Sequence, residues 1–236
     1  MIKIEKTDVY GWDAAIRGMR NPMNSWDKSD STFFDDSEGH VCGIGGKHRG
    51  TNSLELIKVG DNDIDLMKRL SSAGSVHAKY RRMINVTCDI TAPLYWWKEF
   101  DTYKVGTVAN SCSTMHKIHA KEFTKEDFSW EYLYTPYDKK DLGSEELSEY
   151  ILIALNRYRE RFLETKDRDD WLQMIQLLPS SYNQKRTVQM NYEVLVGMYR
   201  DRKNHKLDEW HTFCDWIKEL PYSELITLEG LKNENL

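Results

Sequence analysis

Hydrophobic and polar residues alternate between Met83 and Ile90 with a period of two. One side of this segment carries Ile84, Val86, Cys88 and Ile90, and the other side carries Asn85, Thr87 and Asp89. The alternation predicts a β-strand with one buried face. Pro93 follows, and proline is favoured in the first turn of a helix. We therefore expect the aromatic segment Leu94–Phe100 to form a short helix, with Trp96 and Trp97 in the core.

The spacing of apolar residues predicts further elements on both sides of this segment. Short strands are expected at Met1–Lys6 and Ser53–Val59. The expected helices are Trp12–Met19, Asp61–Leu70, a long helix that begins at Ser144 with an apolar stripe from Leu147 to Phe162, Gln184–Asp201 and Leu207–Lys218. Trp171–Leu178 is a further apolar segment, closed by Pro179. In the helix at Asp61–Leu70, Asp63 and Asp65 lie in the first turn, where carboxylates suit the helix dipole.

Residues 24–50 lack such a pattern. Asn24–His40 is acidic and rich in serine, which indicates a flexible loop that needs a partner or a ligand to become ordered. The glycines of Val41–Gly50 match neither G-x-G-x-x-G nor the P-loop spacing, so this stretch is also expected to be a flexible loop. Its basic residues could still contact an anion; they are Lys47, His48 and Arg49.

The segment Tyr103–His116, directly behind the aromatic helix, is dense in small polar side chains and nearly free of acids. Such a segment is a poor core element and a suitable wall for a ligand that carries oxygens. Cys112, His116 and His119 have the spacing of one helix face, but three residues without a fourth ligand are a weak metal signal, and we expect no metal site. Cys112 could be a nucleophile, although the sequence assigns no base to it.

Composition narrows the class of protein. The chain has 236 residues, 40% of them hydrophobic, and we expect one domain over residues 1–236. A net charge of -5 and a pI near 5.8 argue against a general nucleic-acid binder, although a local basic patch stays open. No apolar run approaches the roughly 18 residues of a membrane span. The cysteines are far apart and no signal-peptide pattern opens the sequence, so we expect reduced thiols and a cytoplasmic protein.

Several residues keep a spacing that resembles the flavin-dependent thymidylate synthases. That family carries a histidine, a proline sixteen residues later, a signature motif, and then Leu-Pro, an asparagine and an arginine at fixed distances; the matching residues are His77, Pro93, Leu178-Pro179, Asn191 and Arg202. Residues 20–26 also resemble the end of the family's first helix. The resemblance covers most of the chain. It implies an α/β fold in which a mostly antiparallel sheet packs with helices.

The signature itself, Arg-His-Arg-x-x-Ser-x-Asn-Glu-x-Ser-x-Arg-Tyr, is degraded. Thr102-Tyr103-Lys104 stands in place of Arg-His-Arg, and the Asn-Glu pair falls at Ala109-Asn110 or Asn110-Ser111. Outside the signature, Ile175 and Glu193 stand where the family has arginines. Charged hydrogen bonds hold phosphate better than neutral ones. Either the substrate differs, therefore, or other cations replace the lost arginines; the candidates are Lys104, Arg81, Arg82 and Arg186.

The resemblance implies a flavoprotein methyltransferase of nucleotide biosynthesis. It would use FAD, with NADPH and methylenetetrahydrofolate as co-substrates, to methylate C5 of a pyrimidine deoxynucleotide, and would assemble as a homotetramer with sites between subunits. The implied cofactor contacts are His77, Asn110 and Asn191. The implied substrate contacts are Glu99, Lys104, Ser111, Ser113 and Arg202. The sequence assigns no catalytic residue.

Two alternatives stay open. Asn191 and Arg202 are eleven residues apart, which on one continuous helix places them on the same face, about 16 Å apart along the axis. They could equally be an ordinary solvated pair on an amphipathic helix. The degraded signature is also compatible with a non-catalytic nucleotide- or flavin-binding descendant, or with catalysis on a cytosine or modified-base nucleotide.

Overall fold

The computed structural model describes residues 1–35, 39–44, 54–134 and 143–229. The chain divides into two compact units. The first unit contains Met1–Lys3, Asp89–Thr102 and Ala109–Thr187, and the second contains Ile4–Cys88, Tyr103–Val108 and Val188–Leu236. No helix in the described ranges combines the length and the apolarity that a bilayer crossing requires. The basic residues Lys47, His48 and Arg49 lie outside the described ranges.

The elements follow the predicted order over much of the chain. The strands are β1 (Lys3–Tyr10), β2 (Thr32–Asp35), β3 (His40–Gly43), β4 (Leu54–Lys58), β5 (Asn85–Pro93), β6 (Val108–Ser111) and β7 (Asn183–Asn191). The helices are α1 (Trp12–Arg20), α2 (Asp61–Ser72), α3 (Leu94–Phe100), α4 (Ser144–Thr165), α5 (Arg168–Leu177), α6 (Tyr192–Arg202), α7 (Asp208–Glu219) and α8 (Glu224–Thr227). The predicted bounds of α3 are confirmed, and those of α1, α2 and α7 agree within two residues.

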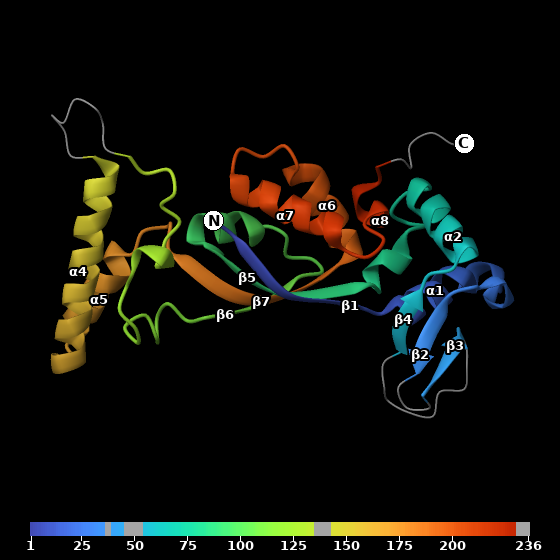
Figure 1. Cartoon of the computed structure of the whole chain (residues 1–236), viewed down its shortest axis with the longest axis horizontal. Helices are drawn as coiled ribbons and strands as arrows, with labels where there is room; N and C mark the ends of the chain where they lie inside the picture. The colour runs from blue at the N-terminus through green and yellow to red at the C-terminus, as the bar shows by residue number, and fades with distance from the viewer. Residues whose placement is uncertain (36–38, 45–53, 135–142, 230–236) are drawn as a thin grey trace. The chain divides into compact units, whose positions relative to one another are not determined.

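One sheet joins strands from both halves of the sequence, in the order β1-β5-β7-β6 (Figure 1). Each of these strands contributes residues to both units. The alternation that predicted β5 is realised, since Val86, Cys88 and Ile90 are at most 1% exposed while the polar residues between them are half-buried. On the polar face, the Asp89 carboxylate pairs with Lys185 at 3.1 Å and accepts a hydrogen bond from Thr187 at 2.7 Å.

The prediction of one helix over Gln184–Asp201 is wrong for its first half. Residues 183–191 form β7, which lies between β5 and β6 in the sheet. Over so short a stretch, the spacing of apolar residues fits a helix or a strand. A strand forms because its backbone groups pair with strands that are distant in sequence. The helix α6 begins only at Tyr192, and Asn191 caps it.

The sequence predicted one long loop after α1, but part of this segment forms β2 and β3. β2 pairs antiparallel with β3 and with β4, and Phe33 is fully buried. The polar residues before β2 gather on Asp63 of α2, which is fully buried. Its Oδ1 pairs with Arg20 Nε at 2.6 Å, and its Oδ2 accepts hydrogen bonds from the hydroxyls of Ser29 and Ser31, each at 2.6 Å. A buried carboxylate therefore orders a segment whose composition predicts disorder.

Each unit has its own apolar core. In the first unit α4 packs on α5, and Leu155 and Met174 are fully buried between them. The stripe predicted for α4 is largely confirmed, although Leu147 is 48% exposed. In the second unit α6 packs on α7 and α8. Trp96 and Trp97 of α3 are at most 1% exposed, which confirms their predicted place in a core.

Candidate functional site

The last residue of α6 is an arginine that aromatic side chains hold in place. Arg202 Nε donates a hydrogen bond to the Tyr103 hydroxyl at 2.9 Å. The Arg202 guanidinium also lies over the rings of Trp210, at 4.7 Å from the centroid, and of Tyr103, at 5.4 Å. Cations over aromatic faces gain about 0.5–2 kcal/mol, more where water is excluded. Burial raises the pKa of the Tyr103 phenol, while the bond from Arg202 acts in the opposite direction. The arrangement is a charged, planar donor whose orientation is fixed in part by two aromatic side chains.

The other end of α6 meets the same loop. Asn191 is the last residue of β7, and its Oδ1 accepts the backbone N–H of Val194 at 3.0 Å, which caps the helix. Gly106 has a positive φ of 81°, and a Cβ on it would lie 2.9 Å from Asn191 Nδ2. Residues 103–107 thus contact both ends of α6, which is about 16 Å long. The prediction that one continuous helix carries Asn191 and Arg202 on a single face is wrong, because Asn191 ends β7 and caps α6, and Arg202 is the last residue of α6.

The first unit contains a second fixed arginine. Arg186 of β7 donates to Asp101 Oδ1 at 2.7 Å and to Gln184 Oε1 at 3.0 Å, and its guanidinium lies 4.2 Å from the centroid of Trp97. Gln184 in turn donates through Nε2 to the backbone oxygen of Cys112 at 2.8 Å. The guanidinium is therefore linked, through one amide, to the hydroxyl-rich segment that follows β6.

The other residues of the first unit that were predicted to contact FAD or the substrate are exposed or half-buried. Asn110 and Ser111 belong to β6, whose residues are all exposed, at one edge of the sheet. Ser113 is exposed, and its Oγ accepts the backbone N–H of His116 at 2.9 Å. Glu99 is half-buried on α3. Amide and hydroxyl groups are accessible here to a ligand that carries oxygens.

In the second unit, His77 and Lys104 are exposed. His77 lies in the turn after α2, where its backbone N–H donates to the oxygen of Gly74 at 3.0 Å. Lys104 stands next to Tyr103 in the loop that contacts α6. The structure thus brings Tyr103 to Arg202 and Gly106 to Asn191. The ligand contacts proposed for Lys104, for His77 and for the residues of the first unit stay predictions.

Glu193 and Ile175 stand at two positions where the resembling family has arginines, and in this chain both side chains have structural roles. Glu193 forms an ion pair with Arg81, with 2.8 Å between Oε2 and Nε, and Arg81 is only 3% exposed. Arg81 also donates to the backbone oxygen of Leu225 at 3.2 Å. Ile175, at the other position, packs against the core of α4 and α5. Arg81 is therefore part of the fold, which leaves Lys104, Arg82 and Arg186 among the predicted substitutes for phosphate-binding cations.

Comparison with solved structures identifies the architecture. A flavin-dependent thymidylate synthase ThyX from Helicobacter pylori, complexed with FAD and dUMP, matches with a TM-score of 0.64 at 14% identity, over 98% of this chain and 100% of that chain. The fold is that of the flavin-dependent thymidylate synthases. A UMP/dUMP methylase PolB from Streptomyces cacaoi, bound with 5-Br dUMP, matches with a TM-score of 0.59 at 13% identity, over 98% and 97% of the two chains.

The thymidylate synthase-like fold confirms the predicted fold class. No protein-family model and no curated protein sequence matches the chain. At such low identity the likeness rests on the arrangement of elements. Sequence reasoning missed the aromatic residues that hold Arg202, because Tyr103 and Trp210 are far apart in the chain and only the folded structure brings both to one guanidinium.

Proposed function

We propose that this protein transfers a one-carbon unit to C5 of a pyrimidine deoxynucleotide, as a flavin-dependent methyltransferase of the thymidylate synthase type. The observation that carries the proposal is Arg202, held by Tyr103 and Trp210 at the end of α6. A guanidinium in a fixed orientation suits recognition of the carbonyl and phosphate oxygens of a nucleotide. The fold that presents it is one that binds FAD and dUMP in the Helicobacter pylori enzyme.

The polar groups of the chain fit a flavin and a nucleotide in kind. Asn191 and Gly106 approach as closely as glycine permits, so the loop and the helix N-terminus form a tight corner with an amide in it. In the proposal His77, Asn110 and Asn191 contact FAD. Glu99, Lys104, Ser111, Ser113 and Arg202 contact the nucleotide. FAD would supply hydride when reduced, and the protein's part is to bind and orient the reactants.

The proposal includes NADPH and methylenetetrahydrofolate as co-substrates and a homotetramer as the assembly in the cytoplasm. It also treats the chain as a single functional domain. A sheet edge with exposed amide and hydroxyl groups on β6 supports a site that another subunit completes.

One observation favours a second candidate, a non-catalytic protein that binds a nucleotide or a flavin. At two positions where the family has arginines, this chain has Glu193, which forms an ion pair with Arg81, and Ile175, which packs against an apolar core. The loss of these two cations lowers the positive charge available to a phosphate. A protein that binds without turnover would tolerate this loss better than an enzyme.

Purified protein distinguishes the two candidates. We expect titration with FAD to give a flavin absorption band, and incubation with reduced FAD, methylenetetrahydrofolate and dUMP, UMP or dCMP to add one carbon to one nucleotide, as seen by mass spectrometry. Arg202→Lys should lower turnover roughly 10–100-fold because the planar fork is lost. Arg200→Lys, on the same helix with a 74% exposed side chain, is the matched control and should not change it.

The outcomes separate cleanly. If FAD does not bind at high micromolar concentration, the proposal of a flavin-dependent enzyme is wrong. Binding of dUMP without turnover of any nucleotide supports the second candidate. Equal effects of the two arginine variants would remove Arg202 from the site.

A further inference from the structure

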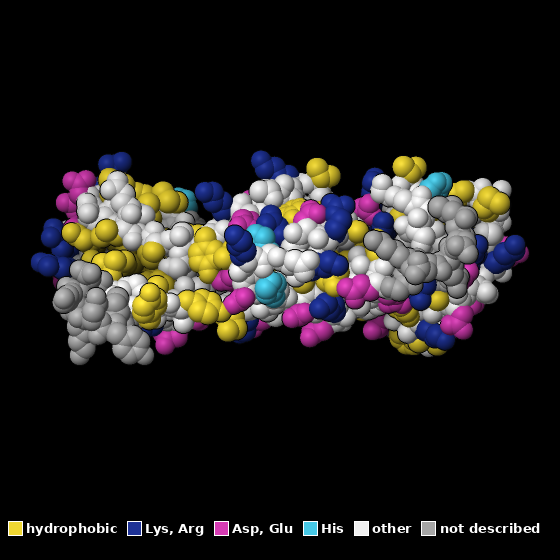
Figure 2. Space-filling model, turned by 90° about the horizontal axis from the view of Figure 1, so that it is seen from above, with side chains coloured by type: hydrophobic (Ala, Val, Ile, Leu, Met, Phe, Trp, Pro, Cys, Tyr) yellow, Lys and Arg dark blue, Asp and Glu magenta, His cyan; other side chains and the backbone are white. Residues whose placement is uncertain are grey.

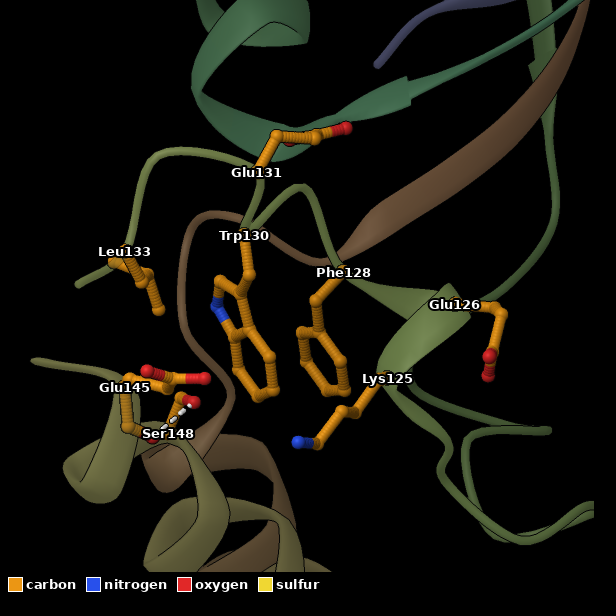
Figure 3. Close-up of a pocket in the computed structure, with 8 residues that line it drawn as sticks. All are labelled: Lys125, Glu126, Phe128, Trp130, Glu131, Leu133, Glu145 and Ser148. Carbon is orange, nitrogen blue, oxygen red and sulfur yellow. Dashed lines mark hydrogen bonds between the residues drawn. The ribbon is translucent and has the colours of Figure 1, made fainter. Parts of the chain in front are cut away.

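One side of the long helix α4 in the first unit is covered, and the opposite side is open. Leu155 is fully buried where α4 packs on α5. Figure 3 shows the segment 125–133 beside the first turns of α4, where aromatic residues of that segment line the same cavity as Ser148. Ile153 lies about 160° around the helix axis from Leu155 and is 63% exposed. The open side of α4 therefore faces away from the core of its own unit.

Apolar residues occupy this open side. Leu147, Tyr150 and Ile153 are 48%, 63% and 63% exposed. They follow one another at intervals of three residues, so their side chains are neighbours on the helix surface. Figure 2 shows hydrophobic side chains gathered on the surface over α4 and α5. A contiguous apolar surface of this kind marks a site of contact with another protein.

A groove of about 550 Å³ runs beside these residues. Ile153, Asn156 and Arg157 line it from α4, and residues 122–125 line its other side. Asn156 joins the two sides, since its Oδ1 accepts the backbone N–H of Phe123 and its Nδ2 donates to the Phe123 oxygen, each at 2.9 Å. The groove is therefore preformed, and its volume is sufficient for an aromatic side chain from outside.

The charges of α4 are distributed unevenly along its length. Its first two turns carry no basic residue, and all three of its arginines lie in its second half. The charged residues of the first half are Glu145, Glu146 and Glu149, and those of the second half are Arg157, Arg159, Glu160, Arg161 and Glu164. Two parallel copies of the helix would bring the acidic halves together, whereas two antiparallel copies bring each acidic half against arginines. The helix thus complements a second copy of itself in the antiparallel direction.

We propose that a second copy of this chain packs on the open side of α4, with the two helices antiparallel and a two-fold axis between Ile153 and Ala154. Tyr150 and Arg157 are equidistant from that axis, so the Tyr150 ring of each copy enters the groove of the other and lies against Arg157 there. Glu146 and Arg161 are also equidistant from it and pair across the contact. No two residues of like charge on α4 are equidistant from the axis.

The groups that this contact needs are available. Among the residues that the structure describes, Arg157 forms no ion pair. Arg161 uses Nε for its pair with Asp170, at 3.1 Å, and a guanidinium has further donors for a second carboxylate. The proposed function includes an assembly of several copies but assigns no surface to it, and this inference names one. Methylation of dUMP tests the function and cross-linking tests this contact, so either can fail alone.

Chemical cross-linking tests the contact and its direction. Ile153→Cys is made in a background of Cys42→Ser and Cys112→Ser, which removes the natural thiols that are not buried. We expect a short bis-maleimide to join two chains of this variant, at a rate that rises with protein concentration. Glu164→Cys is the matched control, because it lies on the same exposed face eleven residues further along. Antiparallel helices hold its two thiols about 30 Å apart and prevent the cross-link, whereas parallel helices would permit it.

A charge reversal tests the residues of the contact. Arg157→Glu should lower the rate of cross-linking of Ile153→Cys roughly tenfold, because it replaces attraction to the Tyr150 ring by repulsion from the acidic half of the other copy. Arg168→Glu makes the same change at an exposed arginine beyond the end of α4 and should alter the rate less than about twofold.

Three results would each overturn the proposal. If another protein covers this face, the purified Ile153→Cys variant gives no cross-link. Equal cross-linking of Ile153→Cys and Glu164→Cys would mean a parallel contact or random collision. Equal effects of Arg157→Glu and Arg168→Glu would remove Arg157 from the contact and with it the proposed register.

Discussion

The buried carboxylate of Asp63 gives the most direct test of what orders the N-terminal part of the second unit. The Asp63 and Arg20 side chains are 0% and 4% exposed, and their ion pair is 2.6 Å long. Asp63→Asn keeps the size of the side chain and removes its charge, so the Arg20 guanidinium stays buried without an opposite charge. Loss of one partner of a buried pair costs about 3–5 kcal/mol. In a chain of this length, that corresponds to a fall in Tm of roughly 6–20 °C.

Urea unfolding followed by circular dichroism measures this free energy of unfolding. Asp65→Asn is the matched control, two residues away on α2, because its pair with Arg69 is 69% and 66% exposed and should contribute less than about 1 kcal/mol. The double variant Asp63→Asn/Arg20→Met removes both charges and should recover part of the loss. If Asp63→Asn costs no more than Asp65→Asn, the buried pair does not order the segment before β2.

Three further predictions concern the site and its surroundings. Tyr103→Phe keeps the ring but removes the acceptor of Arg202, so the Kd for dUMP in calorimetry should rise roughly tenfold, about 1.4 kcal/mol. Gly106→Ala should lower the free energy of unfolding by about 1–2 kcal/mol, because a Cβ there strains a positive φ and strikes the Asn191 amide. Burial raises the pKa of Cys214 to about 11 from 9.0. Its contribution to stability is complete below pH 9 and is lost as the pH rises toward 11, so Cys214→Ala should flatten the alkaline fall in Tm.

Each of these three predictions has a result that would contradict it. An unchanged dUMP affinity in Tyr103→Phe would mean that the phenol does not position Arg202. Wild-type stability of Gly106→Ala would show that the loop moves away from α6 at no cost. The same alkaline profile in Cys214→Ala and the wild type would assign the loss to other groups, of which Tyr80, with a pKa raised to about 12 by burial, is one.

The sequence by itself determined the elements whose signals are local. The alternation in β5, the proline before α3 and the apolar stripe of α4 each depend on residues within one segment, so spacing alone predicted them. The resemblance in layout anticipated the fold, because the order and the lengths of elements persist where identity falls to 14%.

The tertiary structure decided everything that depends on a distant partner. Residues 183–191 became a strand because β5 and β6 lie on either side of them, and the polar segment before β2 became ordered because Asp63 accepts its donors. Asp63 itself was predicted only as a helix-dipole residue. Arg202 received its orientation from Tyr103 and Trp210. Hydrogen bonds, ion pairs and ring contacts act over a few ångströms, and only folding brings residues that are far apart in the chain within that range.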